Sequence, residues 1–207
     1  MFKIINVGDI LPDPQDIPDF ALMQHQTLHY TLSWSYLELT LANLVSAAIY
    51  VTKGNSIIGH AIYNAPTSIE ARFAIVDACV ISLIDENKKL KRLSNYWDKI
   101  YKKLNGLRHN RNILAHGTIL VFGGGDKRKL QVRITSPVKN FTYKKLKKLP
   151  GLSSNDMKTY LFNIGLVNDL IEKVSEIIML FHADRRTSLQ KKYLELEAHL
   201  QKLGGHI

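Results

Sequence analysis

Cysteine is nearly absent from this sequence: Cys79 is the only one among 207 residues. A single cysteine can form no disulfide within the chain and cannot provide a cysteine-based zinc cluster. This usage fits a reducing compartment, so we expect a cytoplasmic protein. Long apolar runs are missing as well, because no stretch reaches the roughly 18 apolar residues that a membrane-spanning helix needs. The sequence therefore predicts a protein without a membrane segment.

The first residues lack the features of a secretory signal. They contain no basic segment followed by an apolar run, and they are interrupted by prolines at positions 12, 14 and 18. We interpret residues 1–19 as a proline-rich lead. A chain of this length that is 45% hydrophobic can bury one sizeable core, so we expect residues 20–207 to form a single domain.

Acidic residues are scarce in the middle of the chain. Residues 88–148 hold 18 lysines and arginines against two acids, Asp98 and Asp126, which gives this segment a net charge of +16 within a chain of +10. The flanking residues together are therefore acidic, with a net charge of −6. Such an asymmetry is expected of a protein that binds nucleic acid or an anionic surface, although a solvated lysine face would have the same composition.

Apolar residues at three- and four-residue spacings predict most of the chain to be helical. In the first helix this spacing marks Leu28, Leu32, Leu39, Leu41 and Leu44 for burial. The predicted helices cover residues 21–51, 65–85, 90–117, 153–186 and 188–203.

Two local signals refine this pattern at helix ends. Thr67 followed by Glu70 has the spacing of a capping box, which would begin the second helix, and Gly117 would end the third. The last predicted helix repeats its apolar residues in nearly strict three-four alternation. Packing within the core and a coiled-coil-like dimer contact both produce such a seam.

One segment departs from the helical period. Residues 118–135 form two short alternating runs joined by the glycines at 123–125, which predicts a β-hairpin. The expected fold class is thus all-α: a helical bundle of about four to five helices with one inserted β-hairpin.

Polar side chains gather at the end of the third predicted helix, in the segment RHNRNILAHG at 108–117. Residues spaced by four share one stripe of a helix, so Arg108, Asn112 and His116 align, with Arg111 beside them. Two arginines are costly to bury unpaired. This face must therefore meet acids, solvent or an anion such as phosphate.

Two acids on the predicted helices could serve this face. Glu38 and Glu70 are candidate partners for the arginines, and Glu38 could also support the site by orienting Arg111 or His116. A surface carboxylate that interacts with a helix dipole is an equally open interpretation of Glu38.

The segment RNILAH, Arg111 to His116, resembles the signature of HEPN domains (higher eukaryotes and prokaryotes nucleotide-binding). That signature is an arginine, commonly followed by a polar residue such as asparagine, and then a histidine after about four to six intervening positions. The resemblance covers residues 20–203 and implies an all-α bundle with the motif near the end of a long inner helix. It also implies a metal-independent ribonuclease without a cofactor, acting as a toxin or phage-defence effector. Many members form homodimers in which two motifs share one cleft, and some pair with an antitoxin protein.

The resemblance assigns roles to the motif residues. His116 would take a proton from a ribose 2′-hydroxyl or give one to the leaving oxygen, and Arg111 would stabilise the phosphate as its charge grows. Asn112 would orient the histidine or the substrate. Outside the motif, Arg108 is a further candidate for substrate binding because it lies on the same helical stripe. The chain departs from one branch of the family, in which a tyrosine two positions after the histidine is modified by the antitoxin. Thr118 occupies that place here.

A basic run follows the hairpin. Lys144, Lys145, Lys147 and Lys148 could bind backbone phosphates of RNA, or they could form a solvated lysine loop.

Two histidines in the first predicted helix are candidates for a metal site. His25 and His29 are one helical turn apart, yet no recognised zinc pattern surrounds them, so we expect no metal site. Two further functions remain open beside the ribonuclease. The chain could be a non-catalytic helical module that binds RNA or a nucleotide, or a scaffold protein in which the two arginines pair internally with Glu38 or Glu70.

Overall fold

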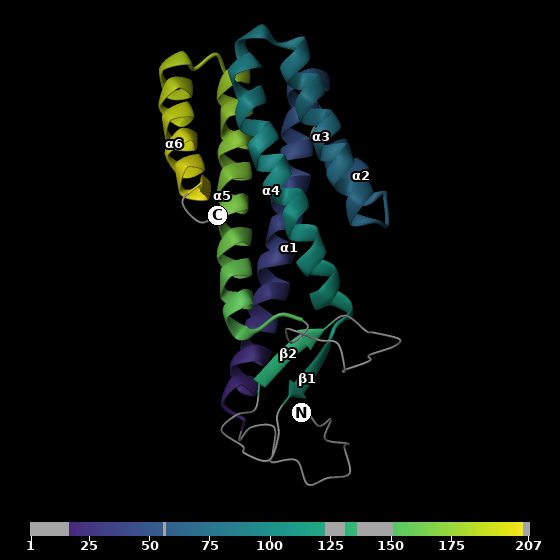
Figure 1. The fold of residues 1–207 in the computed structure, drawn as a ribbon. Helices are drawn as coiled ribbons and strands as arrows, with labels where there is room; N and C mark the ends of the chain where they lie inside the picture. Colours follow the sequence, from purple (N-terminus) through teal and green to yellow (C-terminus); the bar gives the residue numbers. More distant parts are fainter. Residues whose placement is uncertain (1–16, 56, 123–130, 136–150, 205–207) are drawn as a thin grey trace. The chain divides into compact units, whose positions relative to one another are not determined.

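The computed structural model describes residues 17–55, 57–122, 131–135 and 151–204 (Figure 1). Within these ranges it contains six α-helices, one 3₁₀ turn and two strands, so the predicted all-α class with an inserted hairpin is confirmed. The elements are α1 (Pro18–Lys53), α2 (Ile57–Asn64), α3 (Ile69–Glu86), the 3₁₀ turn η2 (Lys88–Leu90), α4 (Lys91–His116), β1 (Thr118–Phe122), β2 (Gln131–Thr135), α5 (Ser154–His182) and α6 (Arg186–Gly204). None of the helices in these ranges is both long and apolar enough to cross a membrane.

The chain packs as two compact units that each combine segments distant in the sequence. Unit 1 consists of residues 1–33 and 107–162, and unit 2 of residues 34–106 and 163–207. Helices α1, α4 and α5 contribute to both units. The sequence predicts one domain over 20–207. In the structure these residues are divided between the two units, and each unit combines two separate segments of the chain.

Unit 1 contains the hairpin. Strands β1 and β2 pair antiparallel, from Thr118 opposite Thr135 to Phe122 opposite Gln131. Ile134 also forms a two-way backbone bridge with Leu152, just before α5. Gly151 makes this turn possible, because its φ of 86° is a conformation that favours glycine.

The start of α5 is held by a reciprocal cap. The Ser153 backbone N–H and hydroxyl both donate to the carboxylate of Asp156, at 2.8 and 2.6 Å, and the Asp156 N–H donates back to the Ser153 hydroxyl. Arg133 of β2 lies 3.5 Å from the same carboxylate. Gln26 of α1 donates to the Ser154 carbonyl at 3.1 Å, so α1, β2 and α5 meet at this cap.

Helix α4 ends at His116, so the predicted stop at Gly117 is confirmed. A Cβ at Gly117 would lie 2.2 Å from the Ile113 carbonyl oxygen and 2.8 Å from the Thr135 carbonyl oxygen. Close packing against β2 therefore requires glycine at this position. The left-handed glycines of the described residues are Gly54, which follows α1, and Gly151.

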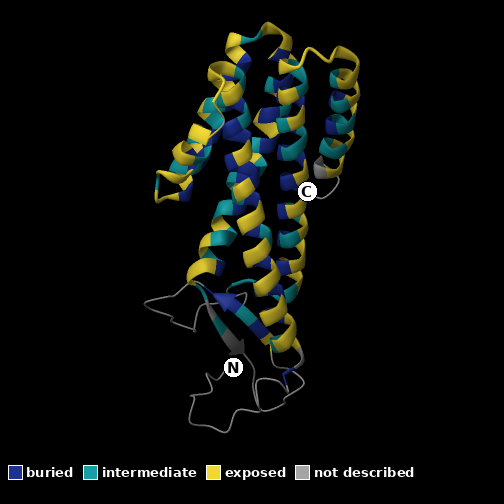
Figure 2. Cartoon of the chain, turned by 180° about the vertical axis from the view of Figure 1, so that it is seen from behind, coloured by how far each residue is buried: buried dark blue, intermediate teal, exposed yellow. Residues whose placement is uncertain are grey.

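Each helix of unit 2 carries both buried and exposed residues (Figure 2). In α3 every residue that its spacing marks for burial is buried: Ile69, Phe73, Val76, Val80, Leu83 and Ile84. Helix α6 lies beside α5, where Lys192 forms an ion pair with Glu176 at 2.8 Å. Arg92 and Tyr96 of α4 both bind Glu197 of α6. Tyr193 and Leu196, which belong to the three-four apolar alternation (the α6 seam), are buried within the chain, so the α6 seam packs in the core at these positions.

Three details of the sequence prediction are wrong. Leu28, Leu32 and Leu39 are 60%, 61% and 50% exposed, because α1 is apolar on more than one side and its core contacts use the side of Leu37 and Leu41. A long helix with apolar residues all round does not reveal which side it buries.

The other two errors concern helix starts. The side chain that caps α3 is Ser68, which accepts from the Ala71 N–H, rather than Thr67. Helix α2 was not predicted, because eight residues are too few to show a helical period. Its position depends on Gly59, where a Cβ would lie 2.4 Å from the Ser46 Cα of α1.

Gly106, inside α4, and Gly117, directly after it, provide a matched test of this packing. We expect Gly117→Ala to destabilise the protein by about 1–3 kcal/mol, because the added methyl would collide with two backbone carbonyls. Gly106→Ala should stabilise it by about 0.5–1 kcal/mol, since Gly106 is helical, exposed and has open space around its Cα. Thermal unfolding followed by circular dichroism measures both. Equal melting temperatures for the two variants would contradict the close approach at Gly117.

Candidate functional site at the end of helix α4

Helix α4 has one apolar side, and Arg111 lies on it. The positions that succeed one another by four and three residues are Leu93, Trp97, Ile100, Leu104, Leu107, Arg111 and Leu114. All are buried except Arg111, which is half-buried. A cation therefore stands in the series where an apolar side chain is expected, at the edge of the packed face.

The other motif residues point away from this face. Asn112 and His116 are exposed, and Arg108 is half-buried. Because an α-helix turns by about 100° per residue, His116 is rotated by about 140° from Arg111. The sector between them contains Arg108, Asn112 and Ala115. One anion could contact both the guanidinium and the imidazole only over this sector, where the exposed Ala115 leaves room.

The side chains of two motif residues, Arg111 and Asn112, are in contact. The Arg111 Nη1 lies 3.5 Å from the Asn112 Oδ1, at the long limit of a hydrogen bond. This contact directs the amide oxygen of Asn112 to the cation and leaves its NH₂ group as a donor for a ligand.

A residue that the sequence analysis did not identify lies behind Arg111. The buried hydroxyl of Tyr160 on α5 donates to the Leu107 carbonyl of α4 at 2.7 Å. Burial and the nearby Tyr30 raise the pKa of Tyr160, while the positive charge of Arg111 acts in the opposite direction. The phenol thus stays protonated and lies within electrostatic range of the guanidinium.

Of the remaining predicted site residues, the structure places only Glu38, and Glu38 is not part of this group. Glu38, predicted as a supporting residue, forms an ion pair with Arg72 at 3.4 Å, and Arg72 also donates to the Pro66 carbonyl. The carboxylate of Glu38 therefore has a partner within unit 2. The four lysines at 144, 145, 147 and 148 lie outside the described residues.

Metal-binding side chains do not cluster in the described ranges. His25 and His29 are exposed and their ring centroids are 4.4 Å apart, but no group of three or more His, Cys, Asp or Glu residues is found within those ranges.

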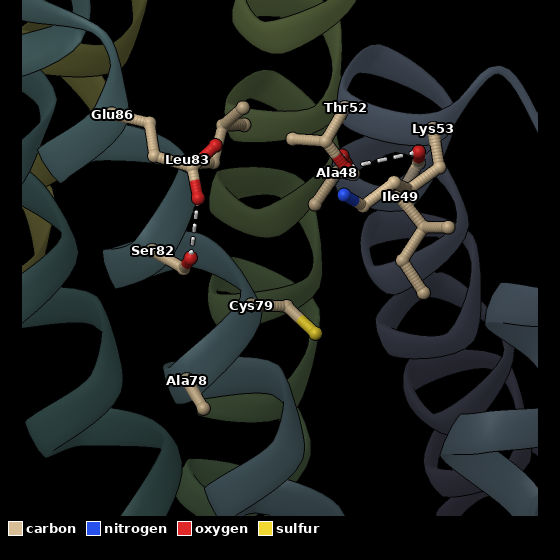
Figure 3. Close-up of a pocket in the computed structure, with 9 residues that line it drawn as sticks. All are labelled: Ala48, Ile49, Thr52, Lys53, Ala78, Cys79, Ser82, Leu83 and Glu86. Atoms are coloured by element: carbon tan, nitrogen blue, oxygen red, sulfur yellow. Dashed lines mark hydrogen bonds between the residues drawn. The ribbon is translucent and has the colours of Figure 1, made fainter.

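The single cysteine is one of the residues that line a separate cavity in unit 2 (Figure 3). It has a volume of about 360 Å³ and lies between α1 and α3. Burial raises the pKa of the Cys79 thiol, which disfavours the reactive thiolate at neutral pH. At the rim, Ser82 donates to the Glu86 carboxylate at 3.2 Å. The cavity therefore offers no activated nucleophile.

Comparison of the chain with protein-family models, with curated proteins and with solved structures finds no match.

The sector over Ala115 can be tested by placing a negative charge there. We expect Ala115→Glu to weaken binding of a short RNA about tenfold, because the carboxylate would repel phosphate between Arg108 and His116. The probe is a fluorescent RNA with 2′-O-methyl riboses, which cannot be cleaved, and the readout is fluorescence anisotropy. Ala198→Glu on α6 is the matched control, since it adds the same charge at another exposed helical alanine. Equal affinities for the two variants would exclude this sector as the anion site.

Proposed function

We propose that the chain is a HEPN-like, metal-independent endoribonuclease with its site at the end of α4. The observation that carries this proposal is the arrangement at Ala115: the exposed His116 on one side, the half-buried Arg111 on the other, and Arg108 and Asn112 between them. These are the groups that phosphodiester cleavage requires, namely a proton carrier and a fixed positive charge. The net charge of +16 on residues 88–148 favours a polyanionic substrate.

The proposed reaction needs no group beyond these side chains and the RNA. A neutral imidazole accepts the proton of a ribose 2′-hydroxyl, and the 2′-oxygen attacks the adjacent phosphorus. The bond from phosphorus to the 5′-oxygen breaks, and that oxygen receives a proton from an imidazolium. The products are a 2′,3′-cyclic phosphate and a 5′-hydroxyl. Arg111 stabilises the extra charge on the phosphoryl oxygens in the transition state.

Two imidazoles are best supplied by two copies of the chain, one acting as base and the other as acid. We therefore propose a homodimer as the active form. Tyr193 and Leu196 of the α6 seam are buried within the chain, so we expect the two copies to meet elsewhere. By the same resemblance we propose that the protein acts in the cytoplasm as a toxin or phage-defence effector. Because Thr118 replaces the tyrosine of one family branch, any antitoxin protein would act by a route other than tyrosine modification.

A second function is favoured by the burial of Arg111. Its side chain is half-buried beside Tyr160, which is also what a non-catalytic module that binds RNA or a nucleotide would show. Such a module would depend on the arginines but not on the imidazole. The third candidate is a scaffold in which the arginines pair internally with Glu38 or Glu70, and the ion pair of Glu38 with Arg72 removes one of these two partners.

The imidazole distinguishes the first two functions. We expect His116→Ala to slow cleavage of labelled single-stranded RNA by at least about 100-fold in the presence of EDTA, because the variant loses its proton carrier. The affinity for 2′-O-methyl RNA should stay within about twofold, since Arg108 and Arg111 remain to bind phosphate. The measurement is the rate of appearance of fragments that end in a 2′,3′-cyclic phosphate.

His109→Ala is the matched control, because His109 is a second exposed histidine on α4. It should cleave RNA like the wild type. Cleavage by His116→Ala at the wild-type rate would refute the proposed mechanism, and a wild type that binds but does not cleave RNA would favour the binding module. A fully active monomer in light scattering would refute the dimeric arrangement.

A further inference from the structure

Tyr160 contacts the helical turn that carries Arg111. Its hydroxyl donates to the Leu107 carbonyl, and in an α-helix this carbonyl is the acceptor for the backbone N–H four residues later, which is that of Arg111. The Tyr160 hydroxyl therefore binds the same carbonyl that accepts the helical hydrogen bond of Arg111. The contact is buried, so water does not compete for it.

Tyr160 is itself held firmly. It is 2% exposed, and its ring lies 5.8 Å from the ring of Tyr30 on α1. The first turn of α5, just before it, is fixed by the Ser153 and Asp156 cap and by the hydrogen bond from Gln26. The hydroxyl is thus a rigid reference point within unit 1.

The motif needs such a reference because it occupies the last two turns of α4. Helix ends open more readily than helix centres, and Arg111 is only half-buried at its position in the packed series. Transition-state stabilisation requires the guanidinium to keep its direction to within a fraction of an ångström.

We propose that Tyr160 is a positioning residue for the ribonuclease reaction: its hydroxyl fixes the Leu107 to Arg111 turn and thereby the direction of the Arg111 guanidinium. This inference rests on the proposed function. Tyr160 does not touch the substrate, and it acts through Arg111.

The test is Tyr160→Phe, which removes the hydroxyl and keeps the buried ring. We expect kcat for RNA cleavage to fall about tenfold while KM changes less than about twofold, because ground-state binding by Arg108 persists and transition-state alignment is lost. Tyr101→Phe is the matched control, as Tyr101 is a half-buried tyrosine of α4 outside the motif. It should retain the wild-type kcat.

A double-mutant cycle separates positioning from a general structural effect. If Tyr160 acts through Arg111, Tyr160→Phe should leave kcat almost unchanged in an Arg111→Ala background. In a Lys99→Ala background it should lower kcat by the same factor of about ten as in the wild type. Equal factors in both backgrounds would overturn the inference. So would a Tyr160→Phe kcat equal to that of Tyr101→Phe, and either result would leave the ribonuclease proposal standing. A wild type that does not cleave RNA would overturn both.

Amide hydrogen exchange gives a readout that does not depend on turnover. The Arg111 N–H should exchange about tenfold faster in Tyr160→Phe than in the wild type, and at an unchanged rate in Tyr101→Phe. Equal exchange in the two variants would show that the hydroxyl does not hold the turn, and would overturn the inference.

Discussion

The position of one positive charge constrains the end of α4. Arg111 occupies a place in the packed series between Leu107 and Leu114, where full burial would cost several kcal/mol and full exposure would open the core. The structure resolves this conflict by half-burial: the guanidinium contacts Asn112 and lies within electrostatic range of Tyr160. A cation at the edge of the packed face can meet an anion from solvent without being fully desolvated.

The hairpin connects this helix end to the start of α5. Two close approaches converge on β2: Gly117, after α4, lies against the Ile134 side chain and the Thr135 carbonyl, and Gly151, before α5, lies against the Ile134 carbonyl. Both positions therefore require glycine. Within unit 1, Ile134 and Thr135 lie against the end of the helix that carries the motif and against the turn before the helix that carries Tyr160.

Sequence periodicity predicted the parts of the fold in which one side of a helix is apolar. The packed series of α4 and the buried residues of α3 followed directly from three- and four-residue spacings, and the end of α4 followed from Gly117. Periodicity failed for α1, because Leu28 and Leu37 are both apolar and only the neighbouring helices decide which of them is buried. It missed α2, whose placement depends on a close approach at Gly59 rather than on a pattern.

The candidate site was predictable in its residue types but not in its surroundings. The spacing from Arg108 to His116 correctly placed these side chains on one helix. It could not reveal that Glu38 binds Arg72, since competing charge partners are chosen by the tertiary structure. Tyr160 was hidden for the same reason: within α5 it is simply another large residue on the packed side, and only the pairing of helices brings its hydroxyl to Leu107.

The low reactivity of the Cys79 thiol has a practical consequence. The protein carries one thiol, and burial keeps that thiol mostly protonated at neutral pH. A cysteine introduced at an exposed position of α4 would react with a maleimide much faster, so a single fluorophore or spin label could be attached there without first removing the native residue.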